Sequence, residues 1–474
     1  MRLLFCTGLA FAFLGQSAGG GRTVAWSDLA PLHRHLEARG VTSSSFASYL
    51  KTLRETNAKR VREGDLDHLV FYLLQSARFT TRPPIEPALS AKALVDGLDP
   101  AQRAAFLRNP QVAASHVPTA VRARIESLLR ALDAPPSDPR LGYFRELVAA
   151  AFPARREREA ALHGEYLRVM RFVYEKEFVA QRSARAADTV TELYRTRGLS
   201  TDTAIEAGYL VYLGLGVVKS LEPNWRIRRA LVVGPGLDLA PRTALLEEGP
   251  PQSYQPWAVI DALLSLGLST TDDLTLVAAD INPRVVTHLQ RARGDPPALT
   301  LVSGIGDDET VTLAEEYRDY FNQLARAAAQ PDAGRGSTTV KGHLRKSVRI
   351  RPSVARALQA ERLDIVTERL GGQPFDLVIA TNIFPYFDDV ELMLALSNIA
   401  AMLAPGGVFL HNEARPLVGD ATAALGLPFQ QSRHGTIATV RGAPPLGDSV
   451  WIHRKSLTIA DCRMTIAGLS IGDC

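Results

Sequence analysis

Three groups of residues have the types and the order needed to bind a small ligand at one edge of a sheet. A glycine turn at residues 234–236 follows the apolar run ALVV, Asp280 ends the run LVAA, and Thr381-Asn382 follows the run LVIA. Glycines in such a turn let the backbone approach a ligand closely. An acidic residue at the end of the next strand can accept hydrogen bonds from both ribose hydroxyls of an adenosine ligand. These residues therefore indicate nucleoside binding.

Each feature also has a simpler interpretation. A lone Gly-x-Gly turn is as often only a tight turn, and Asp280 by itself could be a solvated residue between a strand and a helix. A dinucleotide site would need a third glycine where Leu239 stands. A nucleoside without phosphates, such as S-adenosylmethionine, fits better, because its sulfonium already activates the methyl group. The protein then has only to align the reactants and exclude water.

The elements that must position these residues alternate between strands and helices. Short apolar runs at residues 365–366, 377–379 and 408–410 are typical of strands buried on both faces. One apolar helix face precedes the last of these runs and is made by Leu392, Leu396, Ile399 and Leu403. A Pro-Gly-Gly sequence at 405–407 is expected to end that helix. Such alternation predicts a parallel sheet, with ligands bound at the carboxyl ends of its strands.

Residues 226–415 resemble a class I S-adenosylmethionine-dependent methyltransferase, specifically the chemotaxis-receptor (CheR-type) branch. FDLVIATNIFPYFDD is similar to that branch's strand followed by Arg-Asn and Tyr-Phe-Asp, and LAPGGVFLHNE to its Leu-x-Pro-Gly-Gly strand ending in Glu. SYQPWAVIDALL resembles its Glu-Pro-Tyr-Ser helix, and EEYRDYF stands where its inserted subdomain occurs. Two departures are that Thr381 replaces the branch's Arg, and that Tyr254-Gln255-Pro256-Trp257 replaces its Glu-Glu-Pro-Tyr pattern.

The resemblance implies a role for each matched position. The implied cofactor-binding residues are Gly234, Pro235, Gly236, Tyr254, Asp280, Ile281, Arg369, Leu370, Thr381 and Asn382. Within this set, Arg369-Leu370 match the family's Asn-Leu pair beside adenine. The implied catalytic residues are Asn382, which lines the site of the methyl group, and Tyr386, which lies near the acceptor. A carboxylate acceptor is already ionised at neutral pH and needs no general base.

The resemblance and the element pattern together predict an α/β fold. We expect a Rossmann-like, seven-stranded, mostly parallel sheet of the class I methyltransferase type, preceded by a large all-α domain. The expected domains are a signal-like segment at 1–25, an all-helical domain at 26–225, a Rossmann-like domain at 226–460 with an insertion at about 310–350, and a tail at 461–474.

The composition excludes several classes of protein. The 474 residues are 46% hydrophobic and 22% charged, as in globular proteins, and the net charge of +4 provides no argument for nucleic-acid binding. The sequence contains no Gly-x-Ser-x-Gly, Cys-x-x-Cys or Walker motif, so hydrolase, thiol-redox and nucleotidase functions lack support. His33 and His35 form a His-x-His pair without a nearby third ligand, so no metal site is predicted.

The N-terminus predicts export. Met1-Arg2, the apolar run LLFCTGLAFAFLG and the small residues that follow are typical of a secretory signal, with cleavage after Ala18, Gly19 or Ala25. A cytoplasmic location is the alternative, because S-adenosylmethionine is made in the cytosol. Near the other end, Cys462 and Cys474 could pair in an oxidising compartment or remain free thiols. No later segment predicts a membrane span.

Three functions follow as hypotheses. The first is a methyltransferase that uses S-adenosylmethionine and acts on an oxygen, preferably a carboxylate of a protein or a small molecule. The second is a catalytically degenerate binding or scaffold protein, because fold does not imply function. The third, a nicotinamide-dependent oxidoreductase, is disfavoured by the missing third glycine. The residues leave the acceptor and the oligomeric state open.

Overall fold

The computed structural model describes residues 21–135, 138–182, 186–239, 250–332 and 342–457. Most of the predicted signal segment lies outside these residues, as do Cys462 and Cys474. In the part of the chain that is described, no helix has both the length and the apolarity needed to cross a membrane.

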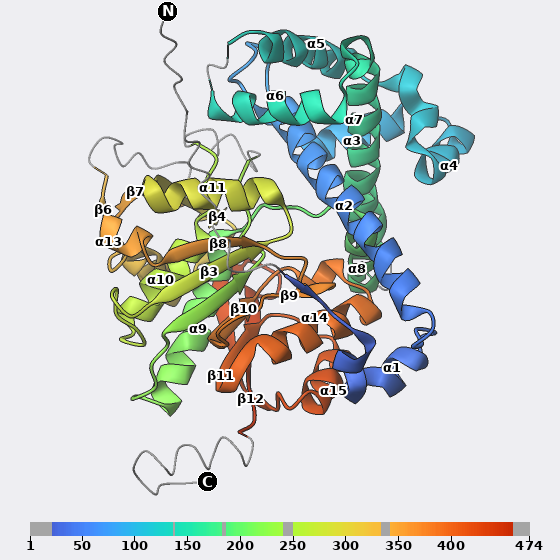
Figure 1. Cartoon of the computed structure of the whole chain (residues 1–474). Coiled ribbons are helices and arrows are strands. Elements are labelled where there is room, and N and C mark those ends of the chain that lie inside the picture. The colour runs from blue at the N-terminus through green and yellow to red at the C-terminus, as the bar shows by residue number, and fades with distance from the viewer. Residues whose placement is uncertain (1–20, 136–137, 183–185, 240–249, 333–341, 458–474) are drawn as a thin grey trace, which may run out of the picture.

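The centre of the molecule is an eight-stranded sheet with the strand order β5-β12-β13-β11-β10-β2-β3-β8 (Figure 1). The strands β8, β3, β2, β10 and β11 run parallel, whereas β13, β12 and β5 add in antiparallel orientation. Their bounds are β2 Arg229–Val233, β3 Thr275–Asp280, β5 Val311–Leu313, β8 Leu358–Arg362, β10 Phe375–Ala380, β11 Leu403–His411, β12 Phe429–Val440 and β13 Leu446–Arg454. The predicted Rossmann-like α/β fold is confirmed, with β5 as one strand beyond the seven expected.

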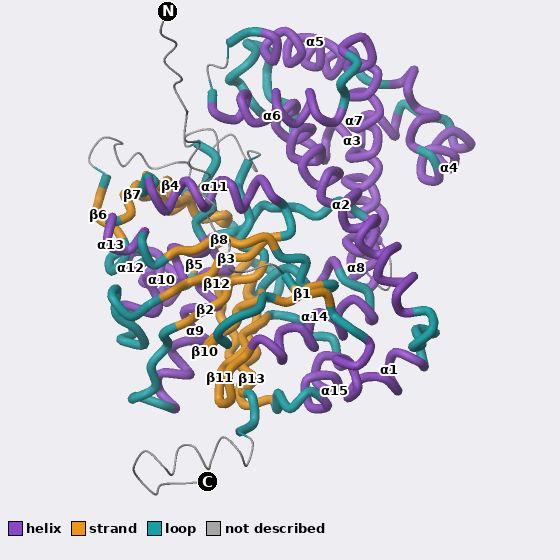
Figure 2. Tube along the Cα trace, in the orientation of Figure 1, coloured by secondary structure: helices purple, strands orange, loops and turns teal. Residues whose placement is uncertain are grey.

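Each face of the sheet is buried by its own set of helices, because successive strand residues point to opposite faces. In β2, Ala230 and Val232 pack in one hydrophobic core, and Leu231 and Val233 pack in the other. The first core contains α9 (Ile205–Leu221), α10 (Gln255–Ser265) and α11 (Pro283–Gly294). The second contains η1 (Trp26–Leu32), α1 (His33–Glu37), α14 (Asp389–Met402) and α15 (Pro416–Ala424). Figure 2 shows these helices around the strands.

One long helix, α2 (Phe46–Gln75), joins the sheet to the remaining helices. Its first turns place Phe46, Leu50 and Leu53 in the core beside α14, whereas its last turns pack among helices away from the sheet. Those helices are α3 Pro87–Asp96, α4 Pro100–Arg108, η2 Pro110–His116, α5 Thr119–Asp133, α6 Pro139–Ala151, η3 Arg155–Glu157 and α7 Arg158–Tyr174. A π-helical turn at Glu175–Val179, η5 (Ala180–Arg182) and α8 (Ala186–Thr196) continue from α7 back along α2 toward the sheet (Figure 1).

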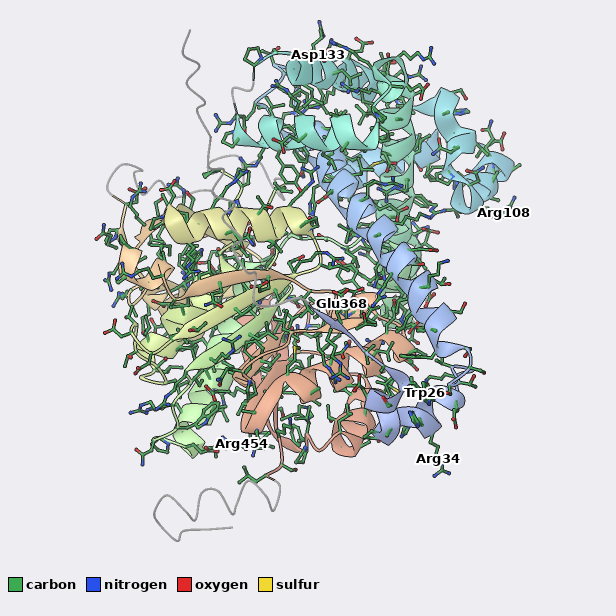
Figure 3. The ribbon with its side chains drawn as sticks, in the orientation of Figure 1. Trp26, Arg34, Arg108, Asp133, Glu368 and Arg454 are labelled. Atoms are coloured by element: carbon green, nitrogen blue, oxygen red, sulfur yellow. The ribbon has the colours of Figure 1, made fainter. Side chains whose placement is uncertain are left out.

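The packing does not divide at the boundary expected near residue 225. Helix α9 lies against β12 and β13, and the core around it continues into α2 and α7. At the N-terminus, β1 (Arg22–Thr23) pairs with β9 (Glu368–Arg369), and Val24 is buried beside it. Figure 3 marks this junction at Glu368 and the start of η1 at Trp26. Residues on both sides of the expected boundary therefore build one structure.

The insertion forms a separate small sheet. Its strands have the order β4-β7-β6 and span Ala298–Gly306, His343–Ile350 and Ala329–Pro331. The expected helix EEYRDYF is α12 (Glu315–Gln323), and the short α13 (Pro352–Ala355) leads to β8. β4, which begins before the expected insertion, pairs with β7 of this small sheet, whereas β5, inside the expected insertion, pairs with β12 of the central sheet.

Two local predictions were wrong. Ile365 and Val366 were expected in a strand, but the strand is β8, which ends at Arg362. Leu403 was expected in a helix ended by Pro405, but α14 ends at Met402 and β11 already begins at Leu403. In both places the apolar residues are buried as expected, so burial was predicted correctly and the element was not. An apolar run alone does not distinguish a strand from the buried segment beside it.

Candidate functional site

A cavity of about 760 Å³ lies at the carboxyl ends of β2, β3, β8 and β10. Seven of the predicted site residues line it together: Gly234, Gly236, Asp280, Ile281, Thr381, Asn382 and Tyr386. The structure thus brings together residues that are up to 152 positions apart, between the ends of three parallel strands and the loops after them. The other wall of the cavity comes from α2, the π-helical turn, α8 and residues 197–204.

The glycine turn lies in close contact with Thr201 and Ile383. Gly234 and Gly236 have φ angles of 69° and 75°, in the left-handed region that favours glycine. A Cβ at Gly236 would lie 2.2 Å from the carbonyl oxygen of Thr201, and one at Gly234 would lie 2.5 Å from Cγ2 of Ile383. Pro235 does not line the cavity, and its carbonyl accepts a hydrogen bond from the hydroxyl of Thr203 at 3.3 Å. Residues 201–203 therefore close directly onto the turn.

Asp280 ends β3 as a nearly buried carboxylate. Its two oxygens accept hydrogen bonds from the backbone N–H groups of Asn282 at 2.8 Å and Gly236 at 3.4 Å. Burial raises the pKa of Asp280 to about 6, the two N–H groups oppose this rise, and the charge of Asp65 adds to it. A carboxylate held this way in a cavity wall retains lone pairs for further hydroxyl donors.

The residues around Asp280 connect it to the helical wall. Asn282 caps α11 through its side-chain oxygen, as the sequence predicted, and its side-chain nitrogen donates to Asp65 on α2 at 2.9 Å. Asp65 also accepts from the hydroxyl of Tyr143 on α6 at 2.9 Å. The position of the β3–α11 turn therefore depends on helices far from it in the sequence.

A second carboxylate, Asp364, lines the cavity and was not predicted. It follows the end of β8, with Leu363 and Ile365 beside it in the lining. Its side chain accepts from Asn57 of α2 at 3.2 Å and from the hydroxyl of Thr367 at 2.9 Å. Because β8 is the neighbour of β3, this carboxylate lies at the same edge of the sheet as Asp280.

Arg369 and Leu370, predicted to lie beside adenine, do not line the cavity. The guanidinium of Arg369 pairs with Asp28 of η1 at 2.6 Å, and Arg369 itself belongs to β9. Leu370 is buried, and its N–H points to the sulfur of Met402 at 3.2 Å. The physical reason is that β8 ends earlier than expected, so the loop after it presents residues 363–365 instead.

Removing Arg369 should therefore affect folding rather than ligand binding. We expect Arg369→Ala to lower the free energy of unfolding by about 1–2 kcal/mol, since its pair with Asp28 is only 14% exposed on each side. Urea unfolding and a titration with S-adenosylmethionine would measure both properties. Arg34→Ala, on an exposed part of α1 whose side chain points outward in Figure 3, is the matched control. A tenfold loss of affinity at unchanged stability would restore the original assignment.

Tyr254, which was predicted to bind the cofactor, also lies outside the cavity lining. It is buried, and its hydroxyl donates to the carbonyl of Ala204 at the start of α9. The next residue, Gln255, donates its side-chain N–H to the hydroxyl of Thr381 at 2.9 Å. Tyr254 thus anchors the segment that closes on the glycine turn, and Gln255 orients a residue of the cavity wall.

Asn382 has a backbone conformation that is uncommon for a residue other than glycine. Its φ angle is 62°, and its N–H and side-chain oxygen bond to the amide of Asn412 at 2.9 and 2.7 Å. Asn412 follows β11 and also donates to Asp448 at 2.9 Å. Such left-handed positions persist only where surrounding contacts hold them, and they are frequent at functional sites.

Tyr386 lies between the sheet and the helical wall. Its ring meets that of Tyr194 of α8 edge to face at 5.5 Å, and its carbonyl accepts from Arg60 of α2 at 2.9 Å. Burial raises the pKa of its phenol, although the charge of Arg197 opposes the rise. The hydroxyl is therefore protonated at neutral pH and acts as a hydrogen-bond donor, not as a base.

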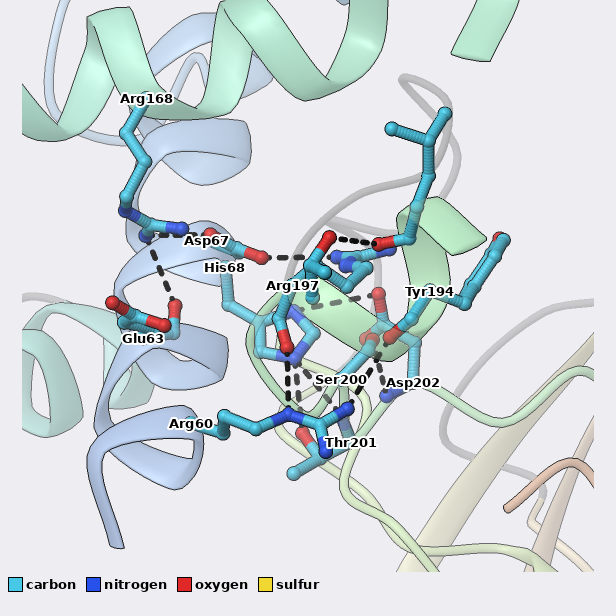
Figure 4. A network of polar contacts seen from close by, with 12 residues as sticks. Arg60, Glu63, Asp67, His68, Arg168, Tyr194, Arg197, Ser200, Thr201 and Asp202 are labelled. Carbon is cyan, nitrogen blue, oxygen red and sulfur yellow. Dashed lines mark hydrogen bonds and ion pairs between the residues drawn. The ribbon is translucent and has the colours of Figure 1, made fainter. Parts of the chain in front are cut away.

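A polar network holds residues 197–204 against α2 (Figure 4). His68 accepts from the N–H of Thr201 at 3.1 Å and faces Asp202 at 3.4 Å. On the same side of α2, Arg60 donates to the carbonyl of Arg197 at 3.0 Å. These interactions place the segment over the cavity and the glycine turn.

Sequence analysis missed this contribution of α2. The residues concerned are Asn57, Arg60, Val61, Gly64, Asp65 and His68, which share one helix face at spacings of three and four. The available signal was the recurrence of Asn57, Arg60, Asp65 and His68 as polar residues on one face of the helix. Buried polar side chains need partners, so such a face points to another polar surface.

Comparisons with known proteins provide no family assignment. No protein-family model matches the chain, and no curated protein matches it. Similar solved structures include the N-methyltransferase NodS of Bradyrhizobium japonicum with S-adenosyl-l-homocysteine (12% identity, 51% of this chain and 84% of that chain, TM-score 0.26). Magnesium protoporphyrin IX methyltransferase of Synechocystis with bound SAM has 9% identity, covers 60% of this chain and 94% of its own, and has a TM-score of 0.27. Similarities this weak carry no argument about function.

Proposed function

We propose that this protein is an S-adenosylmethionine-dependent methyltransferase that acts on an oxygen acceptor. The observation that carries the proposal is the buried Asp280 at the end of β3, which faces the cavity beside a left-handed glycine turn. The strand order places this pair where the order reverses between β2 and β10, which is where open α/β sheets bind ligands. The membership in the CheR-type branch stays a prediction.

The residues present fit this cofactor. Among the described residues Asp280 has no cationic partner and only two N–H donors, so its remaining lone pairs suit the two hydroxyls of a ribose. Asp364 offers a second acceptor from the neighbouring strand end, and Leu363 and Ile365 offer apolar contacts for a base. The glycine turn and Thr381 would hold the amino-acid end. When bound, the cofactor supplies an activated methyl group.

The chain's own residues favour an acceptor that is already ionised. Among the described residues that line the cavity there is no histidine, and Tyr386 is protonated. The carboxylates of Asp280 and Asp364 are held by hydrogen bonds from Asn282, Gly236 and Asn57. With Asp280 and Asp364 assigned to the cofactor and Asp202 facing His68 at 3.4 Å, no lining group among the described residues is left to take a proton from an alcohol or an amine, whereas a carboxylate acceptor needs no base. Tyr386 and Asn382 would orient the acceptor oxygen.

Binding of the cofactor to the full chain tests the proposal. We expect S-adenosylmethionine and S-adenosylhomocysteine to bind one-to-one with micromolar dissociation constants by calorimetry. NADH serves as the control ligand, because the missing third glycine disfavours dinucleotides. Absence of binding to folded protein would reject the proposal and favour a scaffold role. Binding without methyl transfer to any acceptor would support a degenerate enzyme.

A further inference from the structure

The part of the cavity formed by the helical wall and the loop after β10 has a character of its own. It is lined by apolar and aromatic side chains from the helical wall and from the loop after β10, namely Val61, Phe71, Val190, Tyr194, Leu199 and Tyr386. These residues come from α2, from α8 and the loop after it, and from η7 (Phe384–Tyr386). A wall of this kind fits the hydrocarbon body of a ligand.

The charges in this part of the cavity are positive. Lys176 and Arg197 line it, whereas the lining carboxylates among the described residues belong to the strand ends and to Asp202 beside His68. Arg197 shares its partner, because Asp67 contacts Arg197 at 3.0 Å and Arg168 at 2.6 Å. Arg168 is in turn paired with Glu165 at 2.7 Å, so these two arginines are balanced by two carboxylates, and Lys176 is the lining cation whose charge a ligand could meet.

Lys176 is the cation best placed to meet a ligand. Its partner is the adjacent Glu177 at 3.1 Å, and both side chains are more than one-third exposed, so this pair is weak and exchangeable. Lys176 lies in the π-helical turn Glu175–Val179, which follows α7. Such turns are rare and occur frequently at functional sites. The π-helical turn is therefore an independent indication that Lys176 contacts a ligand.

We propose that the methyl acceptor is a small molecule with an apolar body and two acidic groups, one of which binds Lys176. This inference rests on the proposed function. The cavity volume of about 760 Å³ is within the range of small-molecule sites. The reacting carboxylate lies at Tyr386 and Asn382, and the second anion lies at Lys176. A dicarboxylic acid with an apolar spacer meets these requirements.

The transfer step balances without a further reactant. A carboxylate oxygen of the acceptor forms a bond to the methyl carbon as the bond from that carbon to the sulfonium sulfur breaks. The electron pair of the broken bond stays on sulfur, so S-adenosylhomocysteine leaves as a neutral thioether. The product is a monomethyl ester, and no proton is transferred. Its remaining carboxylate stays at Lys176.

Binding of simple acids tests the assignment of Lys176. Linear dicarboxylates of six to twelve carbons and the matching monocarboxylates are titrated into the full chain saturated with S-adenosylhomocysteine. We expect at least one dicarboxylate to bind about tenfold more tightly than its monocarboxylate, as expected of one hydrogen bond to a charged group. Lys176→Met should remove that difference. Lys59→Met, an exposed lysine of α2 paired with Glu63, should leave it unchanged.

Each other outcome has a defined meaning. Equal binding of both acid series, or no effect of Lys176→Met on their difference, overturns the inference while leaving the proposed function intact. Labelling of proteins alone, when labelled cofactor is added to a lysate, overturns it in favour of a protein carboxylate. Failure of S-adenosylhomocysteine itself to bind rejects the proposed function, and with it the inference.

Discussion

Asp280→Asn is expected to lower the affinity for S-adenosylmethionine by about 100-fold or more while the fold remains intact. The loss follows because two hydroxyl-to-carboxylate hydrogen bonds, each worth about 1.5–3 kcal/mol, would be weakened or lost. Burial of the charged carboxylate is costly, which is why the pKa of Asp280 rises to about 6. The free energy of unfolding should therefore not fall, because the neutral amide removes this cost. Calorimetry and thermal unfolding of the same samples measure the two effects.

The control for this variant is Asp420→Asn on the exposed side of α15, which removes one negative charge from the surface. It should bind the cofactor like the wild type. If Asp280→Asn also binds like the wild type, the ribose is not bound by Asp280, and the site assignment is wrong. Unfolding of Asp280→Asn would instead show that the carboxylate mainly holds the turns at Gly236 and Asn282.

The same carboxylate predicts a pH dependence. Ribose hydroxyls donate to the ionised form, so the affinity for the cofactor should rise as pH increases from 5 to 7 and then level off. Binding near pH 6 should release protons, which titrations in buffers of different ionisation enthalpy detect. The pH dependence of the free energy of unfolding has the opposite sign to that of the affinity. A carboxyl whose pKa is raised on folding loses its stabilising contribution as pH rises from about 4 to 6. Proton release that persists in Asp280→Asn would assign the titration to another group.

Gly64→Ala is expected to destabilise the protein by about 3 kcal/mol or more and to weaken cofactor binding. A Cβ at Gly64 would lie 1.9 Å from the carbonyl oxygen of Leu199, and one at Gly198 would lie 2.3 Å from the N atom of Gly64. The chain after α8 touches the backbone of α2 at this point, so a methyl group must push the two apart. The displaced segment includes Thr201, which closes on the glycine turn.

Gly216→Ala in α9 is the matched control, because it makes the same change inside a helix where, among the described residues, no atom beyond the helix's own neighbouring backbone lies within 4 Å of the added Cβ. This variant should be neutral or more stable by about 0.5–1 kcal/mol, as expected when alanine replaces glycine in a helix. Urea unfolding and calorimetry with S-adenosylhomocysteine measure both variants. If Gly64→Ala is as stable as Gly216→Ala and binds normally, α2 does not hold the segment that closes the site.

The fold and half of the site were accessible from local patterns. The ALVV run before Gly234, the LVAA run before Asp280 and the LVIA run before Thr381 each predicted a buried parallel strand and its carboxyl end. Asn282 correctly predicted the start of α11, because a cap depends only on the residues beside it. Residues at the ends of neighbouring parallel strands must meet at one edge, so these predictions also implied their proximity.

The tertiary structure alone decided the rest. Asp364 replaces Arg369 at the cavity because the pairing of β8 with β3 ends that strand at Arg362, and pairing register is a long-range property. Tyr254 anchors the start of α9 through the carbonyl of Ala204. Because Ala204 is 50 positions away, the sequence around Tyr254 could not predict this contact. The contact of Gly64 with Leu199 likewise depends on how two helices approach. Sequence by itself determined β2, β3 and β10 and the chemistry at their ends, since these are local. Which side chains cover that edge was decided by packing between distant segments.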